Sequence, residues 1–266
     1  MRLRIAHSSV YRYDPPAAGV IQVLRLTPRN HEGQYVQRWH IDVVPDARLA
    51  AHEDAFGNIT HVLTADGPLE ELRVEVDGEV ETQNANGVVR GTVERFPPSL
   101  FLRDTALTQA DSAIRDFAQK IRDVSGGVVL AELHGLLDRL FEDFAGTTGA
   151  AAPAKNASEA FASKCGAPKD LAHIFIGAAR TLGIPARYVS GYFREPNADA
   201  DTGHAWAEAH VPGLGWVGFD PSNGACPTDG HVRVAIGLDS LGAAAVRGTR
   251  LGVGAETLAV AIKVDQ

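Results

Sequence analysis

Cysteine is scarce in this sequence, which has only Cys165 and Cys226 among its 266 residues. Two cysteines cannot build the disulfide framework of a small secreted domain, and their spacing matches no zinc-binding motif. The opening residues, MRLRIAHSSVYRYDPP, lack an apolar stretch of signal-peptide length. No apolar run approaches the ~20 residues of a membrane-spanning helix. We therefore expect a cytoplasmic protein that crosses no membrane and has no disulfide scaffold.

Clustered positive charge is also missing. The chain has 25 lysine and arginine residues against 33 aspartate and glutamate residues, a formal net charge of −8, and no basic run. A protein that binds nucleic acid usually shows a basic face, so we expect no nucleic-acid partner. Acidity of this size mainly favours solubility.

The first part of the chain, up to about residue 98, has the character of β-structure. Short segments rich in β-branched and aromatic residues are separated by turn-forming residues. One of these, Asp77-Gly78, lies between two alternating runs and predicts a hairpin. The pair Pro97-Pro98 closes this part, so residues 1–98 are predicted to form a β-rich N-terminal domain.

After residue 98 the apolar residues recur with the period of an amphipathic helix. This pattern predicts helices over residues 108–124, 128–144 and 158–164, with a loop over residues 145–157. Hairpin-linked strands follow the helical block. That order indicates an α+β fold for residues 99–266 rather than a doubly wound sheet.

The clearest predicted helix covers residues 168–182. Pro168 suits its first position, because the amide hydrogen that proline lacks has no intrahelical partner there. Asp170 lies in the first turn, where the helix dipole favours negative charge. Gly183 can adopt the left-handed conformation that ends a helix.

Three polar residues occur in an order that permits acyl-transfer chemistry. Cys165 lies just before the predicted helix, His204 begins a predicted strand, and Asp220 ends the next strand after the turn PGLG. A helix N-terminus and an imidazole both stabilise a thiolate, and a carboxylate behind the imidazole fixes its tautomer. The spacing permits a Cys165–His204–Asp220 triad without requiring one.

Longer segments resemble a known family. The segments LAHIFIGAARTLGIPARYVSGY, GHAWAEAHVPGLGWVGFDPSNG and HVRVAIG resemble the bacterial transglutaminase-like family, whose members are often described as candidate cysteine proteases. The segments HSSVYRYDPP, RLTPR and DAFGN resemble the β-rich region that accompanies this core. The resemblance implies a papain-like core, a β-sandwich-like N-terminal domain and C-terminal strands that return to the sheet. It also implies hydrolysis or acyl transfer on a peptide or protein amide, without a cofactor or a metal.

The resemblance fails at one position. The family's helix start usually reads Gly-x-Cys-x-Asp-x-Ala-His, with the cysteine as nucleophile. The corresponding segment here is GAPKDLAH, so Pro168 occupies the nucleophile position. The family's histidine and aspartate match His204 and Asp220. Proline offers no nucleophile and no titratable proton.

Three interpretations remain open. In the first, the scaffold has lost catalysis and binds a ligand, a partner protein or a second copy of itself. In the second, Cys165 replaces the missing nucleophile and acts with His204 and Asp220. In the third, Cys165 and Cys226 pair with each other or bind a metal together with a histidine.

Four further residues are predicted near the cleft, each with a simpler structural role beside it. Trp206, two residues past His204, could line the cleft or pack in the sheet. Asp170 could contact a ligand or only cap the helix. Pro168 marks the helix start, and Cys226 could be a small packed side chain.

Overall fold

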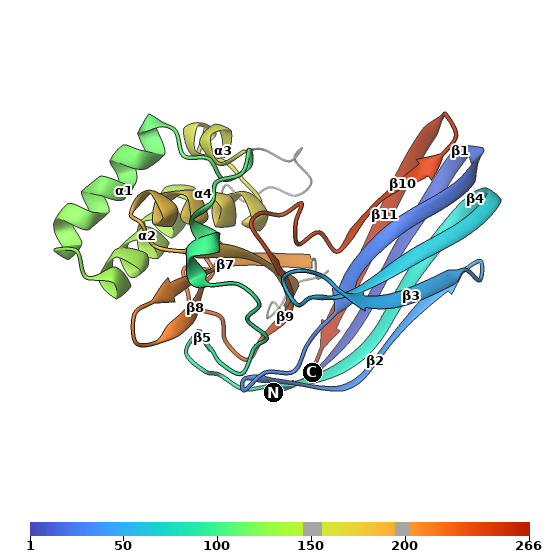
Figure 1. Cartoon of the computed structure of the whole chain (residues 1–266), viewed down its shortest axis with the longest axis horizontal. Coiled ribbons are helices and arrows are strands. Elements are labelled where there is room, and N and C mark those ends of the chain that lie inside the picture. The colour runs from blue at the N-terminus through green and yellow to red at the C-terminus, as the bar shows by residue number, and fades with distance from the viewer. Residues whose placement is uncertain (146–155, 195–202) are drawn as a thin grey trace.

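The structure is a computed structural model that describes residues 1–145, 156–194 and 203–266 (Figure 1). Two antiparallel sheets organise the chain. One is a sheet of long strands to which both ends of the chain contribute, and the other is a shorter sheet packed against helices. This arrangement confirms the predicted α+β class with a β-rich N-terminal region.

The long-stranded sheet contains β1 (Arg2–Thr27), β2 (Gln34–Val44), β3 (Arg48–Glu53), β4 (Ile59–Thr82), β10 (Val246–Leu251) and β11 (Ala255–Asp265). Buried and exposed residues alternate along much of the central pair, β1 and β4, as expected for a sheet with one packed face. Strands β10 and β11 both pair with β1, so the two chain ends lie side by side, with Arg4 opposite Asp265.

The hairpin predicted at Asp77-Gly78 is wrong, because β4 runs straight through these residues. Gly78 pairs with Ile5 of β1 on one side and with Trp39 of β2 on the other. A Cβ atom at position 78 would lie 2.2 Å from the Trp39 ring. The glycine therefore allows a close approach of an aromatic ring within a strand, where the sequence suggested a turn.

The helical layer contains the 3-10 helix η1 (Pro98–Leu102) and the helices α1 (Ser112–Ser125), α2 (Val129–Phe144), α3 (Ala157–Ser163) and α4 (Pro168–Thr181). All the predicted helices form, and the Asp111 side chain caps α1 by accepting the amide hydrogen of Ile114. Most of the loop predicted over residues 145–157 lies outside the described residues. None of the described helices combines the length and the apolar character needed to cross a membrane.

Helix α4 lies at the centre of this layer, and every residue from 170 to 180 is buried. Pro168 is its first residue, as predicted. The Asp170 carboxylate accepts the amide hydrogen of Ala167 at 2.9 Å, which satisfies a donor at the helix start. Gly183 follows the helix with a φ of 74°. The start of α4 is therefore a fixed feature of the core.

The shorter sheet has the order β5-β8-β7-β6-β9 and consists of β5 (Val88–Val89), β6 (Ala186–Phe193), β7 (Gly203–Val211), β8 (Gly215–Phe219) and β9 (His231–Gly237). Strands β7 and β8 form the hairpin predicted around the turn PGLG. The alanines at 205, 207 and 209 belong to the same core as α4. Their small side chains let the helix pack close to β7.

Hydrogen bonds join the two sheets. The Asn58 amide group bonds to both the N–H and the C=O of Ile236, each at 2.8 Å. His7 of β1 lies 3.0 Å from the hydroxyl of Tyr192 in β6. The long-stranded sheet is therefore held against β6 and β9, close to the predicted site.

Candidate active site

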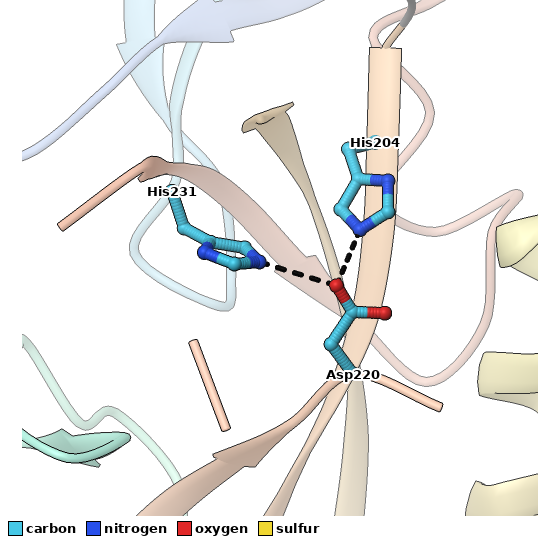
Figure 2. A group of neighbouring side chains, drawn as sticks. All are labelled: His204, Asp220 and His231. Atoms are coloured by element: carbon cyan, nitrogen blue, oxygen red, sulfur yellow. Dashed lines mark hydrogen bonds and ion pairs between the residues drawn. The ribbon is translucent and has the colours of Figure 1, made fainter. Parts of the chain in front are cut away.

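The β7–β8 hairpin brings His204 and Asp220 together, as their spacing predicts. Ala207 pairs with Phe219, so the start of β7 lies opposite the residues that follow β8. The Nε2 atom of His204 lies 2.6 Å from Oδ2 of Asp220 (Figure 2). Asp220 is fully buried and His204 is almost so. An imidazole backed by a carboxylate is the arrangement that orients a general base.

Asp220 accepts several further hydrogen bonds. Its Oδ2 accepts one from the Asn223 side chain at 2.7 Å, and its Oδ1 accepts two from the amide and hydroxyl of Ser222. Burial would raise the pKa of Asp220, but the hydrogen bonds from His204 and His231 outweigh burial and hold the pKa well below its usual range. The carboxylate is therefore an anion in a fixed orientation.

His231 is a second imidazole at this carboxylate, and the sequence did not identify it as a site residue. It opens β9, and its Nε2 lies 3.1 Å from Oδ2 of Asp220 (Figure 2). The ring packs against Phe193 and Trp206, with centroid separations of 4.4 and 5.3 Å. Burial lowers the pKa of His231, an effect that Asp220 partly offsets. The available signal was that the family-like segment HVRVAIG begins with this residue.

Two imidazoles and one carboxylate are a donor set that could hold a metal ion, and their ligand atoms lie within 4.8 Å of one another. The proton arrangement does not fit this use. The backbone N–H of Thr228 donates to Nδ1 of His231 at 3.1 Å, which leaves the ring proton on Nε2, the atom that would bind the metal. Metal-ligating histidines instead donate through the other nitrogen. The geometry is that of a hydrogen-bonded network.

A cavity of about 650 Å³ lies beside His204. Its walls come from the start of α4, from β6, β7 and β9, from residues 240–245, and from the long-stranded sheet, which contributes His7, Leu26 and Ile262. Most of the surface is apolar, and no acidic side chain of the described residues lines it. Such a mostly apolar concavity with a few polar groups is typical of a ligand site.

Pro168 lines this cavity together with His204. The residue that matches the family's nucleophile position therefore borders the same space as the imidazole. Lys169 also lines the cavity. The ring of Pro168 presents only carbon atoms there.

The other predicted site residues are not among the described residues that line the cavity. Asp170 is buried and caps the helix. Trp206 is buried in the sheet, with its ring centroid 6.1 Å from that of His204. Cys165 is half-buried in the segment before α4, where Ser163 donates a hydrogen bond to its carbonyl oxygen.

Cys226 lies away from the cavity walls and packs partly against the main core. Burial raises the pKa of its thiol, and Asp138 raises it further, which is the opposite of activation. No disulfide joins Cys165 and Cys226. The structure thus joins His204 to Asp220 and places His204 and Pro168 in one cavity, and neither cysteine is among the described residues that line it.

Two family models match the chain: the bacterial transglutaminase-like N-terminal region over residues 3–81, and the transglutaminase-like superfamily over residues 131–221. The chain belongs to the transglutaminase-like family. The second match includes α4, His204 and Asp220, and the first covers most of β1 to β4. The predicted resemblance is therefore confirmed for both parts of this transglutaminase-like protein.

Similar proteins span the full length of the chain. An uncharacterised protein of Mycobacterium leprae is 28% identical over 284 residues, which cover 100% of this chain and 99% of the relative. An uncharacterised protein of Mycobacterium tuberculosis is 26% identical, with 99% and 92% coverage. A crystal structure of a candidate cysteine protease from Cytophaga hutchinsonii matches with a TM-score of 0.79 at 20% identity, covering 100% of this chain and 90% of that one. This similarity shows a shared transglutaminase-like fold.

Proposed function

We propose that this transglutaminase-like protein binds a peptide or protein amide in the cavity beside His204 without forming a covalent intermediate. The observation that carries the proposal is the position of Pro168. It borders the cavity that His204 also lines, at the place that corresponds to the family's cysteine. A proline ring cannot attack a carbonyl carbon, whereas the imidazole and its carboxylate partner are retained.

The cavity suits such a ligand. Its aliphatic walls can bury an extended peptide side chain, and polar atoms come from His204 and from the hydrogen-bonded pair of His7 and Tyr192. A segment of a partner protein, or of a second copy of this chain, is a ligand of this kind. Cys165 and Cys226 form no disulfide, which suits the reducing cytoplasm that the sequence predicts.

The alternative is an amide hydrolase or acyl transferase that uses Cys165. Its thiolate would attack an amide carbonyl, while His204 accepts the thiol proton and then protonates the leaving amine. Cys165 is not one of the described residues that line the cavity. Gly166, the next residue, packs closely on the helix start, where an added Cβ would lie 2.9 Å from Cβ of Asp170. This packing favours the binding function, because near-attack geometry must be accurate to about an ångström.

The substitution Pro168→Cys tests the proposal by restoring a thiol at the family's position. In a background with Cys165→Ser and Cys226→Ser, we expect iodoacetamide to alkylate the new thiol well below pH ~8.5, the pKa of a free thiol. His204→Ala in the same background should return the reaction to the ordinary profile.

The matched control places the cysteine one position later, as Lys169→Cys with Pro168 unchanged. That thiol should react with an ordinary profile and without dependence on His204. An unactivated thiol at position 168 would contradict the proposal, since it would mean that the cavity does not hold the proline and the imidazole face to face.

A further inference from the structure

We propose that two copies of this chain pair edge to edge through β11, so that their long-stranded sheets join into a single sheet. The partner of the β11 edge is a second copy of the same chain, antiparallel to the first about a twofold axis at Val260. The pairing does not depend on the proposed function, although it adds to the wall of the same cavity.

Strand β11 has a hydrogen-bonded neighbour on one side. It pairs with β1 from Arg4 to Asp14, and within the described part of the chain no other backbone pairs with residues 256–262. Figure 1 shows β10 and β11 along one border of the sheet and β2 and β3 along the other. The outer N–H and C=O groups of residues 256–262 can therefore pair with another strand.

Two large apolar side chains of β11 are exposed although they lie on the packed face of the sheet. Leu258 stands opposite Tyr11 of β1 and Val260 stands opposite Ser9, and both of these β1 residues are buried. Leu258 and Val260 are themselves each 53% exposed. The packed face thus extends beyond the residues that cover it, and a further strand on this edge would bury apolar area.

The other edge strands of the described residues are protected against such pairing. In the long-stranded sheet they carry charged side chains, which discourage a neighbouring strand. These are Arg38 and Asp42 in β2, Arg48 and Glu53 in β3, and Arg247 and Arg250 in β10. In the shorter sheet, β5 has 2 residues, and the side-chain amides of Gln34 and Asn58 bond to the backbone of β9. On β11, by contrast, the run from Thr257 to Ile262 contains no charge, proline or glycine.

The sequence of β11 is complementary to itself in the antiparallel register centred on Val260. Val260 then faces Val260 of the second copy, and Leu258 faces Ile262. Lys263 faces Thr257, and no residue faces a like charge. Opposite residues of an antiparallel pair point to the same side, so the apolar side chains at 258, 260 and 262 of both copies form a continuous patch. A twofold pair uses the same edge of each copy, so the assembly closes as a dimer.

The dimer also extends the cavity beside His204. Ile262 lines that cavity, and a Cβ atom at Gly203 would lie 3.6 Å from Cδ1 of Ile262. Side chains opposite each other in an antiparallel pair have Cβ atoms ~4.5–5.5 Å apart. Leu258 of the partner subunit therefore lies at the rim of the cavity, and each copy contributes an apolar residue to the ligand site of the other.

Sedimentation velocity of the full chain between ~1 and ~300 µM tests the dimer, because this range covers the dissociation constants of modest interfaces. We expect a concentration-dependent dimer in the wild type. Val260→Lys places two ammonium groups opposite each other and should weaken dimerisation at least ~tenfold. The matched control Val253→Lys makes the same exchange at a more exposed position outside the paired segment, and it should leave the dimer unchanged. Circular dichroism should show that both variants are folded.

Cysteine crosslinking reports the register. In a background with Cys165→Ser and Cys226→Ser, Val260→Cys should form a disulfide between copies under mild oxidation, because directly opposite residues have Cα atoms ~4.5–5.5 Å apart. Leu258→Cys alone should crosslink much more slowly. A mixture of Leu258→Cys with Ile262→Cys should crosslink readily, since these two positions face each other.

Three results would overturn the proposed dimer. They are a monomer throughout the concentration range, equal effects of Val260→Lys and Val253→Lys, and crosslinking of Leu258→Cys as fast as that of Val260→Cys. If Val260→Lys does not fold, the crosslinking of Val260→Cys still decides the proposal. The Pro168→Cys alkylation reads the cavity within a single copy, so failure of the dimer is distinguishable from failure of the proposed function.

Discussion

Asp220 is the residue through which the site is held together. It accepts five hydrogen bonds, from both imidazoles, from Asn223 and twice from Ser222. A fully buried carboxylate is stable only when such donors replace water. Because they do so here, the charge of Asp220 is part of the folded structure and not only of the site.

Replacing Asp220 with asparagine should lower the free energy of unfolding by about 3 kcal/mol at neutral pH, because the new NH2 group would face donors and leave them unsatisfied. The pKa of Asp220 is lowered in the folded state, so its contribution is present above the usual carboxyl pKa and is lost as pH falls through the folded value. Urea unfolding should therefore show a smaller difference in the free energy of unfolding between the wild type and Asp220→Asn at pH ~3 than at neutral pH. Asp77→Asn, at an exposed ion pair with Arg38, should cost less than ~1 kcal/mol. Equal losses in the two variants would contradict this account.

Strand β7 packs on the helical layer with one face and carries polar and aromatic residues on the other. Its alanines face α4, while Trp206 and Glu208 alternate with them and face the other way. His204, at the start of the strand, lines the cavity beside the start of α4. Glu208 is fully buried between two guanidinium groups, with Arg187 at 2.7 Å and Arg233 at 2.6 Å. Arg187 also stacks on Trp216. These contacts tie β6, β7 and β9 together next to His231.

The substitution Glu208→Gln should destabilise the protein by about 3–5 kcal/mol, because it leaves the buried guanidinium of Arg233 without its anionic partner and removes one of the two partners of Arg187, which keeps Glu94. Burial raises the pKa of Glu208, but Arg233 and Arg187 outweigh burial and lower it to about 2. The stabilisation is therefore complete above the ordinary pKa near 4.5 and is lost as pH falls toward 2. Denaturant unfolding of the wild type and Glu208→Gln at several pH values between about 2 and 4.5 measures this loss of stabilisation. Glu142→Gln, which removes an exposed pair with Arg139, should change stability by less than ~0.5 kcal/mol; a comparable loss there would contradict the assignment.

The contacts that could be predicted are those between residues close together in the sequence. His204 and Asp220 could be paired in advance, because a short turn fixes the register of a hairpin. His231 could not, because it reaches Asp220 from β9, which lies beyond β6 from β7 in the sheet. Asp77-Gly78 looked like a turn because the reason for the glycine is not local. Trp39, which packs on Gly78, lies far from it in the sequence, in the neighbouring strand β2.

At the scale of the whole molecule, the cavity depends on both sheets. The long-stranded sheet supplies His7, Leu26 and Ile262, and the last of these lies in β11 at the far end of the sequence. Because β10 and β11 pair with β1, a division of the chain after residue 98 would separate strands that belong to one sheet. The proposed domains are therefore interdependent in folding.

Calorimetry of the full chain should show one cooperative transition, and residues 99–266 expressed alone should not fold stably, because β10 and β11 would expose unpaired edges. Adding residues 1–98 to that fragment should restore structure. Two separate transitions, or a stable isolated fragment, would contradict the interdependence.

The central claim is that the wild-type site contains no activated thiol, and the rate of Cys165 alkylation against pH tests it most directly. Mass spectrometry of the labelled peptide in wild-type protein and in His204→Ala follows this thiol alone. We predict the same pH profile in both proteins, because Cys165 is not among the described residues that line the cavity beside His204. Rapid labelling of Cys165 in acidic solution that His204→Ala abolishes would contradict this claim.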